Sequence, residues 1–188
     1  MIPNGKVIKM PSPNFEIADN AIKAVCLHGT AGPAGASLAW LRNPQPNNPG
    51  ARVSANYLVT KAGIIYELVD WQAGKRAWAN GIVETFDTSV EWLVEAVRTG
   101  LNPNLVTVSI EHEASTAEME SHASMTDAQF NASIELTASI LRAARLPANH
   151  ESVIGHSQIS GTRKFNCPGV IFVPAYTEVL LKRHPELK

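Results

Sequence analysis

The sequence has little of the features that would tie a protein to nucleic acid or to a membrane. Its 188 residues carry a formal net charge of −1 and no clustered basic stretch, so nucleic acid is not expected as a partner. No apolar run approaches the ~20 residues that a membrane-spanning helix needs, so we expect no membrane insertion. Positions 1–13 lack the apolar core of a secretory signal, and we therefore expect a protein made in the cytoplasm without a signal peptide.

Cysteine is also scarce, since the chain has only Cys26 and Cys167. The two could form one disulfide, which would suit a secreted protein. The alternative that we favour makes Cys167 a metal ligand and Cys26 a small buried core residue. Cys26 lies two residues before His28 on an expected strand, so both side chains face the same side. An oxidised cysteine pair could therefore remove a metal bound at His28.

The composition and pattern of the chain predict one α/β domain over residues 1–188. Hydrophobic residues make up 45% of the chain, and a chain of this length buries about 70% of its unfolded surface. There is no internal repeat or low-complexity linker. The expected strands are 23–28, 54–59, 64–69 and 105–112, the expected helices are 34–42, 89–98, 126–145 and 170–182, and a surface loop is expected at 43–50. This irregular alternation predicts a central mixed β-sheet flanked by helices.

Two local signals support these elements. The second and third expected strands are separated by a short turn that ends at Gly63, and a glycine there favours a hairpin because it tolerates positive φ. Thr126 and Gln129 form the pattern of a capping box at the start of the longest helix. Pro147 is expected to stop this helix. Between these limits apolar residues recur at helical spacing, at Phe130, Ile134, Ala138 and Leu141.

The most informative segment, 155–169, sets His156 and Cys167 around a loop that carries two cations. An earlier histidine, His28, closes an apolar stretch of the chain. Two imidazoles and one thiolate would give zinc three protein ligands and leave one tetrahedral position open for water. This arrangement is typical of a zinc ion that takes part in a reaction. The residues therefore predict a zinc hydrolase.

The order and spacing of four stretches carry a further pattern, which runs from about position 24 to about position 174. The stretches are 25–30, 53–59 with 63–69 and 76–78, 108–113, and 155–169. Together they resemble the type 2 zinc-dependent N-acetylmuramoyl-L-alanine amidases, a family related to peptidoglycan recognition proteins and to phage lysozymes of the amidase type. The resemblance implies hydrolysis of the amide bond between N-acetylmuramic acid and L-alanine in peptidoglycan or muropeptides, with Zn²⁺ as cofactor.

The resemblance also implies roles for individual residues. It makes His28, His156 and Cys167 the metal ligands and Glu111 the residue that takes and returns the proton of the zinc-bound water. Strand alternation puts Glu111 and Glu113 on the same face. Only Glu111 is expected to reach the metal site, with Glu113 either solvated or bound to a neighbouring main-chain group. The alternative for Glu111 is an exposed strand carboxylate.

The cations of the last stretch are candidates for the oxyanion. Lys164, in preference to Arg163, is expected to stabilise the negative charge that develops on the substrate carbonyl, and Arg163 is expected to contact substrate. The alternative is that both are solvated loop charges. In the family the third ligand commonly lies two residues beyond this lysine, whereas Cys167 lies three beyond it. The loop therefore holds one extra residue, and this affects where Lys164 is aimed.

Two other positions depart from the family pattern. The family usually has histidine where Asn56 stands, and often another where Ala79 stands, and neither is a metal ligand. We expect Asn56 to replace that histidine as a hydrogen-bonding substrate contact. Trp78 is expected either to line the groove or to belong to the core, as aromatic side chains often do. His112 shares a strand with Glu111 but is not an expected ligand.

Three classes of function compete. The first is the amidase, expected without a separate cell-wall-binding domain, either as a phage or prophage endolysin released at lysis or as a cytoplasmic enzyme that recycles muropeptides. The second is a recognition module that binds peptidoglycan without cleaving it; such relatives tend to lack the third ligand, which is present here as Cys167. The third is a hydrolase with Cys167 as nucleophile and His156 as base, although nothing around Cys167 resembles a cysteine-protease signature.

Overall fold

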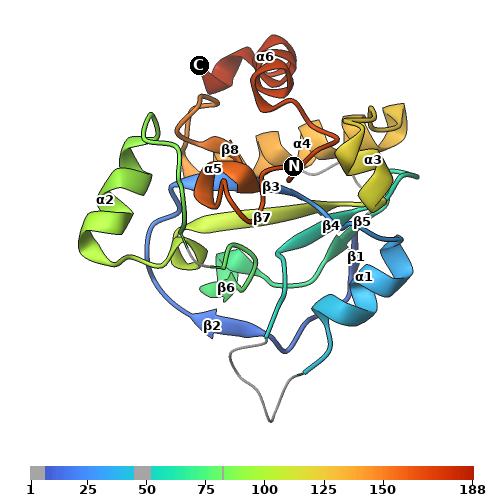
Figure 1. Cartoon of the computed structure of the whole chain (residues 1–188), viewed down its shortest axis with the longest axis horizontal. Helices are drawn as coiled ribbons and strands as arrows, with labels where there is room; N and C mark the ends of the chain where they lie inside the picture. The colour runs from blue at the N-terminus through green and yellow to red at the C-terminus, as the bar shows by residue number, and fades with distance from the viewer. Residues whose placement is uncertain (1–6, 45–51, 82) are drawn as a thin grey trace.

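Six strands form the central sheet of the computed structural model, in the order β1-β5-β4-β7-β3-β8 (Figure 1). The structure describes residues 7–44, 52–81 and 83–188, so positions 45–50 of the expected loop lie outside the described residues. Neighbouring strands are parallel except for the antiparallel pair β4–β5. In sheet order the strands are β1 (Val7–Lys9), β5 (Ile65–Glu67), β4 (Tyr57–Val59), β7 (Thr107–His112), β3 (Ala24–Gly29) and β8 (Val153–Gly155). A separate antiparallel pair joins β2 (Phe15–Ile17) to β6 (Lys75–Ala77).

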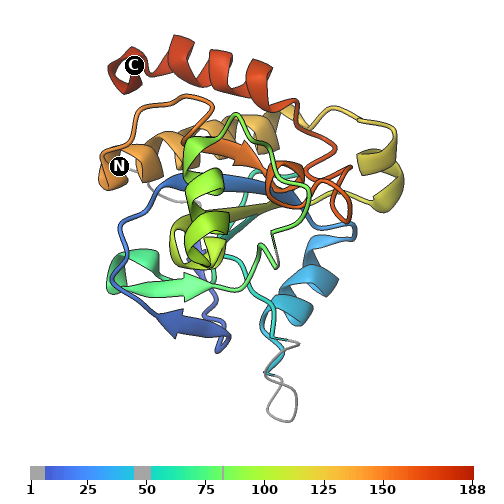
Figure 2. The same ribbon diagram turned by 60° about the vertical axis from the view of Figure 1, so that its left-hand side comes forward.

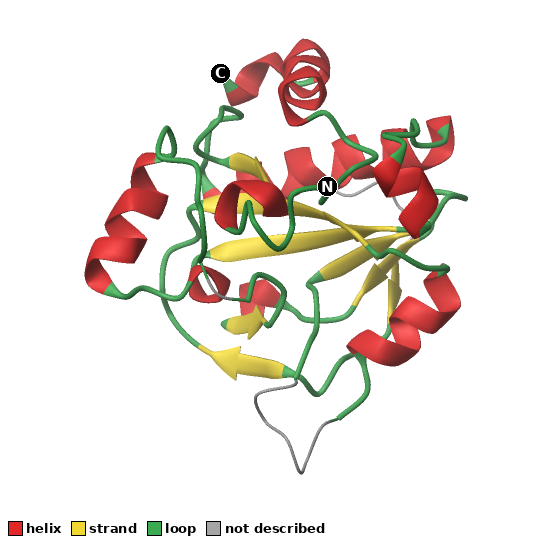
Figure 3. Cartoon of the chain, viewed as in Figure 1, coloured by secondary structure: helices red, strands yellow, loops and turns green. Residues whose placement is uncertain are grey.

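Helices cover both faces of the central sheet (Figure 3). The largest hydrophobic cluster lies between one face and helices α4 (Asp127–Ala144) and α6 (Val173–Arg183). The opposite face packs against α2 (Glu91–Thr99) and α1 (Ala34–Leu41), each through its own cluster. The expected mixed sheet flanked by helices is therefore confirmed, in a single α/β domain. No helix among the described residues is long and apolar enough to cross a membrane.

Shorter elements complete the chain. They are the helices α3 (Thr116–Glu120) and α5 (His156–Ile159) and the 3₁₀ segments Trp71–Ala73, Pro103–Leu105 and Pro185–Leu187. Figure 2 shows α5 and the loop after it lying next to the ends of the central strands. This is the edge of the sheet at which parallel strands present their carboxyl ends, where ligand sites of open α/β sheets usually lie.

The two local signals in the sequence are confirmed with one change. β4 and β5 form a hairpin, and Gly63 adopts φ +75 in its turn. The hydroxyl of Thr126 caps α4 by accepting from the backbone N–H of Gln129 at 3.2 Å. The Gln129 side chain does not complete a capping box, because it donates to the carbonyl oxygens of Val59 and Glu113, each at 3.0 Å. The helix ends at Ala144, before Pro147 is reached.

The strands of the hairpin are shorter than the expected 54–59 and 64–69. Asn56 interrupts their ladder, because the backbone N–H groups of Leu68 and Val69 both donate to its carbonyl oxygen, at 2.8 and 3.3 Å. Two residues thus oppose one, as in a bulge. The strands β1, β2, β6 and β8 were not expected from the sequence. Each has three residues, too few for an alternating pattern to be recognised.

Candidate metal centre and cleft

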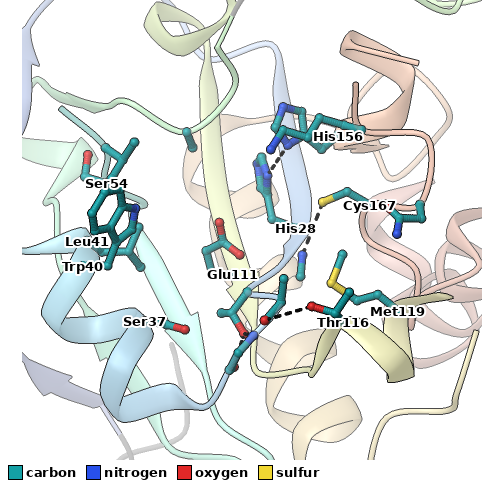
Figure 4. Close-up of a pocket in the computed structure, with 18 of the residues that line it drawn as sticks. His28, Ser37, Trp40, Leu41, Ser54, Glu111, Thr116, Met119, His156 and Cys167 are labelled. Atoms are coloured by element: carbon teal, nitrogen blue, oxygen red, sulfur yellow. Dashed lines mark hydrogen bonds between the residues drawn. The ribbon is translucent and has the colours of Figure 1, made fainter. Parts of the chain in front are cut away.

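Three metal-donor side chains from distant parts of the chain meet at the carboxyl edge of the sheet. His28 lies near the end of β3, His156 opens α5 directly after β8, and Cys167 lies in the loop between α5 and α6. Because β3 and β8 are parallel neighbours, the two histidines follow strands that end side by side. The possible ligand atoms of the three residues all lie within 4.8 Å of one another, and Figure 4 shows them converging on one point.

The end of β8 explains how Cys167 reaches this point. β8 pairs with β3 only as far as Leu27, which lies opposite Gly155. The next backbone N–H of β3 that points this way belongs to Gly29, and it donates to the Sγ of Cys167 at 3.5 Å. The thiol therefore occupies the place where a fourth residue of β8 would otherwise continue the pairing with β3.

The histidines are arranged as neutral nitrogen donors. The Nε2 of His156 lies 3.0 Å from the carbonyl oxygen of Asn80, and a carbonyl only accepts, so Nε2 carries the ring hydrogen. This leaves the lone pair of His156 on Nδ1, which lies 2.9 Å from the Nδ1 of His28. Burial lowers the pKa of His156 to about 4, and burial together with His156 holds the pKa of His28 well below its usual value. Both rings are therefore uncharged at neutral pH.

The thiol of Cys167 suits a metal ligand better than a nucleophile. Burial, reinforced by the Glu111 carboxylate, raises its pKa to about 12, so without a cation it stays protonated at neutral pH. A bound cation would deprotonate it. Cys26 and Cys167 are both free thiols. Two neutral imidazole nitrogens and one such thiol, all buried, fit the donor set of zinc with three protein ligands.

Glu111 lies directly opposite His28 in the β3–β7 pairing, and in Figure 4 its carboxylate lies beside the histidines. Burial raises its pKa from 4.5 to about 7, against the opposing effect of Lys164. Its Oε2 is buried and has no hydrogen-bond partner among the described residues. Glu113 instead accepts from the backbone N–H groups of Ala34 and Lys61, at 3.0 and 2.8 Å. This is the main-chain alternative stated for Glu113.

The two cations of the loop differ in their surroundings. Both line the cleft above the metal donors. The charge of Lys164 lowers the pKa of Glu111, so its ammonium lies within electrostatic reach of that carboxylate. The guanidinium of Arg163 is paired with Glu84 at 3.0 Å. Lys164 is therefore the cation directed to the donor cluster, and Arg163 is held at the rim.

Of the two predicted substrate contacts Trp78 and Asn56, only Trp78 lies at the cleft. Trp78 is half-buried and lines the cleft, and its indole N–H has no partner among the described residues. The structure does not bring Asn56 to the cleft, which corrects the expectation of a substrate contact. Asn56 is fully buried, and its amide donates to the Val69 carbonyl at 3.0 Å and accepts from the Ser109 N–H at 2.9 Å. Its side chain thus joins strands at the bulge.

His112 ties the metal edge of the sheet to the helices behind it. Its Nδ1 donates to the carbonyl oxygen of His28 at 2.8 Å, so its Nε2 accepts from the hydroxyl of Ser133, 2.7 Å away. The Ser133 oxygen in turn lies 2.7 Å from the hydroxyl of Tyr176, which lies 2.8 Å from that of Thr137. This buried hydrogen-bond chain joins β3 and β7 to α4 and α6.

The cleft has a volume of about 570 Å³ and contains residues that the sequence did not single out. Trp40 of α1 is one of them, and in Figure 4 it lies across the cleft from His156 and Cys167. It belongs to a predicted helix, but nothing in the local sequence distinguishes it from a core aromatic. Asn80, which is buried and does not line this cleft, was also not singled out, because its backbone carbonyl accepts from His156, a role that carries no residue-type signal.

Comparison with known proteins agrees with this geometry. The profile of a family described as N-acetylmuramoyl-L-alanine amidase matches residues 18–170. The N-acetylmuramoyl-L-alanine amidase A of Achromobacter lyticus is 28% identical over 180 residues, which cover 86% of this chain and 84% of that protein.

Solved structures share the fold. A crystal structure of a selenomethionine derivative of AmpD aligns with a TM-score of 0.67 at 23% identity, covering 93% of this chain and 94% of that chain. The amidase AmiD of E. coli, in complex with the substrate anhydro-N-acetylmuramic acid-L-Ala-D-gamma-Glu-L-Lys, aligns with a TM-score of 0.53 at 26% identity. That alignment covers 78% of this chain and 52% of the AmiD chain.

Proposed function

We propose that this enzyme, which belongs to the N-acetylmuramoyl-L-alanine amidase family, cleaves the amide bond between N-acetylmuramic acid and L-alanine with a zinc ion held by His28, His156 and Cys167. The observation that carries the proposal is the convergence of three buried metal donors beside a carboxylate at the base of a cleft. Zinc with an open coordination position supplies an electrophile for the amide carbonyl and makes water nucleophilic at neutral pH.

Glu111 is the general base and then the general acid. It takes the proton of the attacking water and returns it to the leaving amine of L-alanine. Its pKa of about 7 is supportive, because proton transfer in both directions is most efficient when the pKa lies near the working pH. Its Oε2 has no partner among the described residues, which leaves a lone pair free for the water.

Lys164 stabilises the oxyanion that forms at the attacked carbonyl. Its position in the cleft and its effect on the pKa of Glu111 support this role. Arg163 already pairs with Glu84, so we assign it to the substrate-binding rim. Trp78 is half-buried and lines the cleft, and we assign it a contact with the substrate.

The finer proposal is that the enzyme acts on the intact wall, as an endolysin does after release from the cell that makes it. Two further clefts adjoin the cleft over the donor cluster. One shares Asn166 and Cys167 with it, and the other shares residues that include Trp78 and His156. The first of these clefts is lined by Phe165 and Phe172, whose side chains are 75% and 74% exposed. Exposed aromatic side chains at a site commonly mark binding surfaces, and a surface that extends this far suits a polymer. Recycling of soluble muropeptides is the alternative.

The test is product analysis by mass spectrometry, with sacculi and with a soluble muropeptide, each with and without a chelator. The expected product is a stem peptide with a free L-alanine amine, lost with the chelator and restored by zinc. Faster release from sacculi supports the endolysin, and faster release from the muropeptide supports recycling. Binding to sacculi without any cleavage, with zinc supplied, would contradict the amidase and leave a recognition module.

A further inference from the structure

We propose that Asn80 is a positioning residue that sets the tautomer of both metal-binding histidines, one through its backbone and the other through its side chain. The inference rests on the zinc site of the proposed function. Asn80 lies in the segment after Trp78 and is 1% exposed. Neither the resemblance of the sequence nor the donor cluster itself points to this residue.

The backbone half concerns His156. The carbonyl oxygen of Asn80 accepts from the Nε2–H of His156 at 3.0 Å. This leaves the lone pair of the ring on Nδ1, the atom that would bind the metal. The position of this carbonyl is itself fixed, because the backbone N–H of Asn80 and that of Ala79 both donate to the Oδ1 of Asn104, at 2.8 and 2.9 Å. A ligand histidine that donates its other N–H to a carbonyl is held in one tautomer and one ring orientation.

The side-chain half begins with the orientation of the Asn80 amide. Thr107 donates its hydroxyl hydrogen to the carbonyl oxygen of Pro103 at 2.9 Å, so its oxygen is left to accept. The Asn80 atom 2.7 Å from that oxygen must therefore be the donor Nδ2. The acceptor Oδ1 then points the other way, where it is buried with no partner among the described residues.

A second unpartnered atom belongs to the ring of His28. The Nε2 of His28 is also buried without a partner among the described residues, and the Asn80 side chain, acting as an acceptor, raises the pKa of His28. When the Nδ1 of His28, which faces His156, binds a metal through its lone pair, the ring hydrogen resides on Nε2. One hydrogen bond from His28 Nε2–H to Asn80 Oδ1 then satisfies both atoms. Asn80 thus favours the tautomer of each histidine that presents Nδ1 to the metal.

The experiment measures zinc affinity by competition with a chromogenic chelator for the wild type, Asn80→Ala and Asn80→Asp. Outer partners of ligand histidines typically contribute about 10–100-fold to metal affinity, so we expect Asn80→Ala to weaken zinc binding by at least about tenfold. Asn80→Asp keeps an acceptor oxygen, and we expect it to restore affinity to within about threefold of the wild type. Asn14→Ala is the matched control: Asn14 is also a buried asparagine with two side-chain hydrogen bonds, to the carbonyls of Asn43 and Val53, and its loss should leave zinc affinity unchanged.

A second readout separates positioning from general loosening of the fold. In ¹⁵N-histidine spectra of the zinc-loaded wild type, the ring N–H signals of His28 and His156 should both be Nε2–H and exchange slowly. In Asn80→Ala the His156 signal should persist, because the backbone carbonyl remains, while the His28 signal exchanges rapidly. Equal zinc affinity of Asn80→Ala and wild type, or loss of both ring signals together, would overturn the inference. A wild type that binds no zinc would instead contradict the metal site itself.

Discussion

At the scale of single residues, we propose that Lys164 acts on the reaction in two ways. It is assigned to the oxyanion, and its charge also lowers the pKa of Glu111 against the raising effect of burial. Glu111 must be ionised to accept a proton, so activity should rise with pH through its pKa. Removing the cation raises that pKa and moves the rise to higher pH.

We therefore expect Lys164→Ala to lower turnover about 10²–10³-fold, the usual cost of one oxyanion donor, and to shift the acid limb of the kcat/KM profile upward. The measurement is a pH–rate profile on a soluble muropeptide. Arg163→Ala is the control for the acid limb, because Arg163 is paired with Glu84 and does not contribute to the pKa of Glu111. Near-full activity of Lys164→Ala would show that the assignment is wrong, and an unmoved acid limb would show that Lys164 does not act on Glu111.

At the scale of elements, the junction of β8 and α5 depends on Gly155. A Cβ at this position would lie 2.8 Å from the Cδ of Pro168, the residue after Cys167. The backbone of β8 and the loop with the third metal donor therefore approach as closely as they do only because residue 155 has no side chain. His156 follows Gly155 directly, so this glycine allows two of the metal donors, His156 and Cys167, to lie close together.

We expect Gly155→Ala to lower the free energy of unfolding by about 1–3 kcal/mol, as overpacking does, and to weaken zinc binding by displacing Cys167. Thermal unfolding and chelator competition measure the two effects. Gly35→Ala is the matched control, because a Cβ there meets nothing within 4 Å and alanine favours the helix α1. Unchanged zinc affinity in Gly155→Ala would mean that the loop adapts without moving Cys167.

The hydrogen-bond chain behind the sheet is also a property of elements, since it joins β7 to α4 and α6. Ser133→Ala removes the donor to the Nε2 of His112 and leaves a buried nitrogen unsatisfied, at an expected cost of about 1–3 kcal/mol in the free energy of unfolding. Urea unfolding gives the value. Ser121→Ala on the exposed end of α3 should stay within about 0.5 kcal/mol of the wild type. Equal effects of the two serines would contradict the connected chain.

How far the sequence predicts these elements depends on their length and on where the hydrogen bonds go. The spacing of Ile134 and Leu141 predicted α4, and Gly63 predicted the hairpin, because both signals are local. Three-residue strands such as β8 carry no period, although β8 positions His156. Asn56 was misassigned because only the structure shows that its amide is used by backbone groups of neighbouring strands.

The site residues also divide into those that the sequence identifies and those that only the structure shows. His28, His156, Cys167 and Glu111 were nominated from residue type and from the family pattern. Asn80 could not be nominated, since one of its two contacts is made by its backbone carbonyl and the other depends on the orientation of its side-chain amide, which the hydroxyl of Thr107 fixes.

At the scale of the whole molecule, a second cleft lined by Phe165 and Phe172 shares Asn166 and Cys167 with the first and is the proposed extension of the site. If this extension holds the wall polymer, Phe165→Ala should slow release of stem peptide from sacculi several-fold and leave cleavage of a small soluble muropeptide unchanged. Stacking on one aromatic ring is worth roughly 1 kcal/mol, which corresponds to about a fivefold effect. Initial rates on both substrates, measured with the same enzyme preparation, provide the comparison. Equal slowing on both substrates would place Phe165 in the support of the loop instead.

The most direct test of the central claim is a zinc titration of metal-free protein, followed by release of stem peptide with a free L-alanine amine. Release should rise in proportion to added zinc, reach its plateau at one zinc per chain, and be absent at every zinc concentration in Cys167→Ala. Undiminished release in excess chelator, or zinc bound at one per chain with no release, would contradict a zinc amidase built on His28, His156 and Cys167.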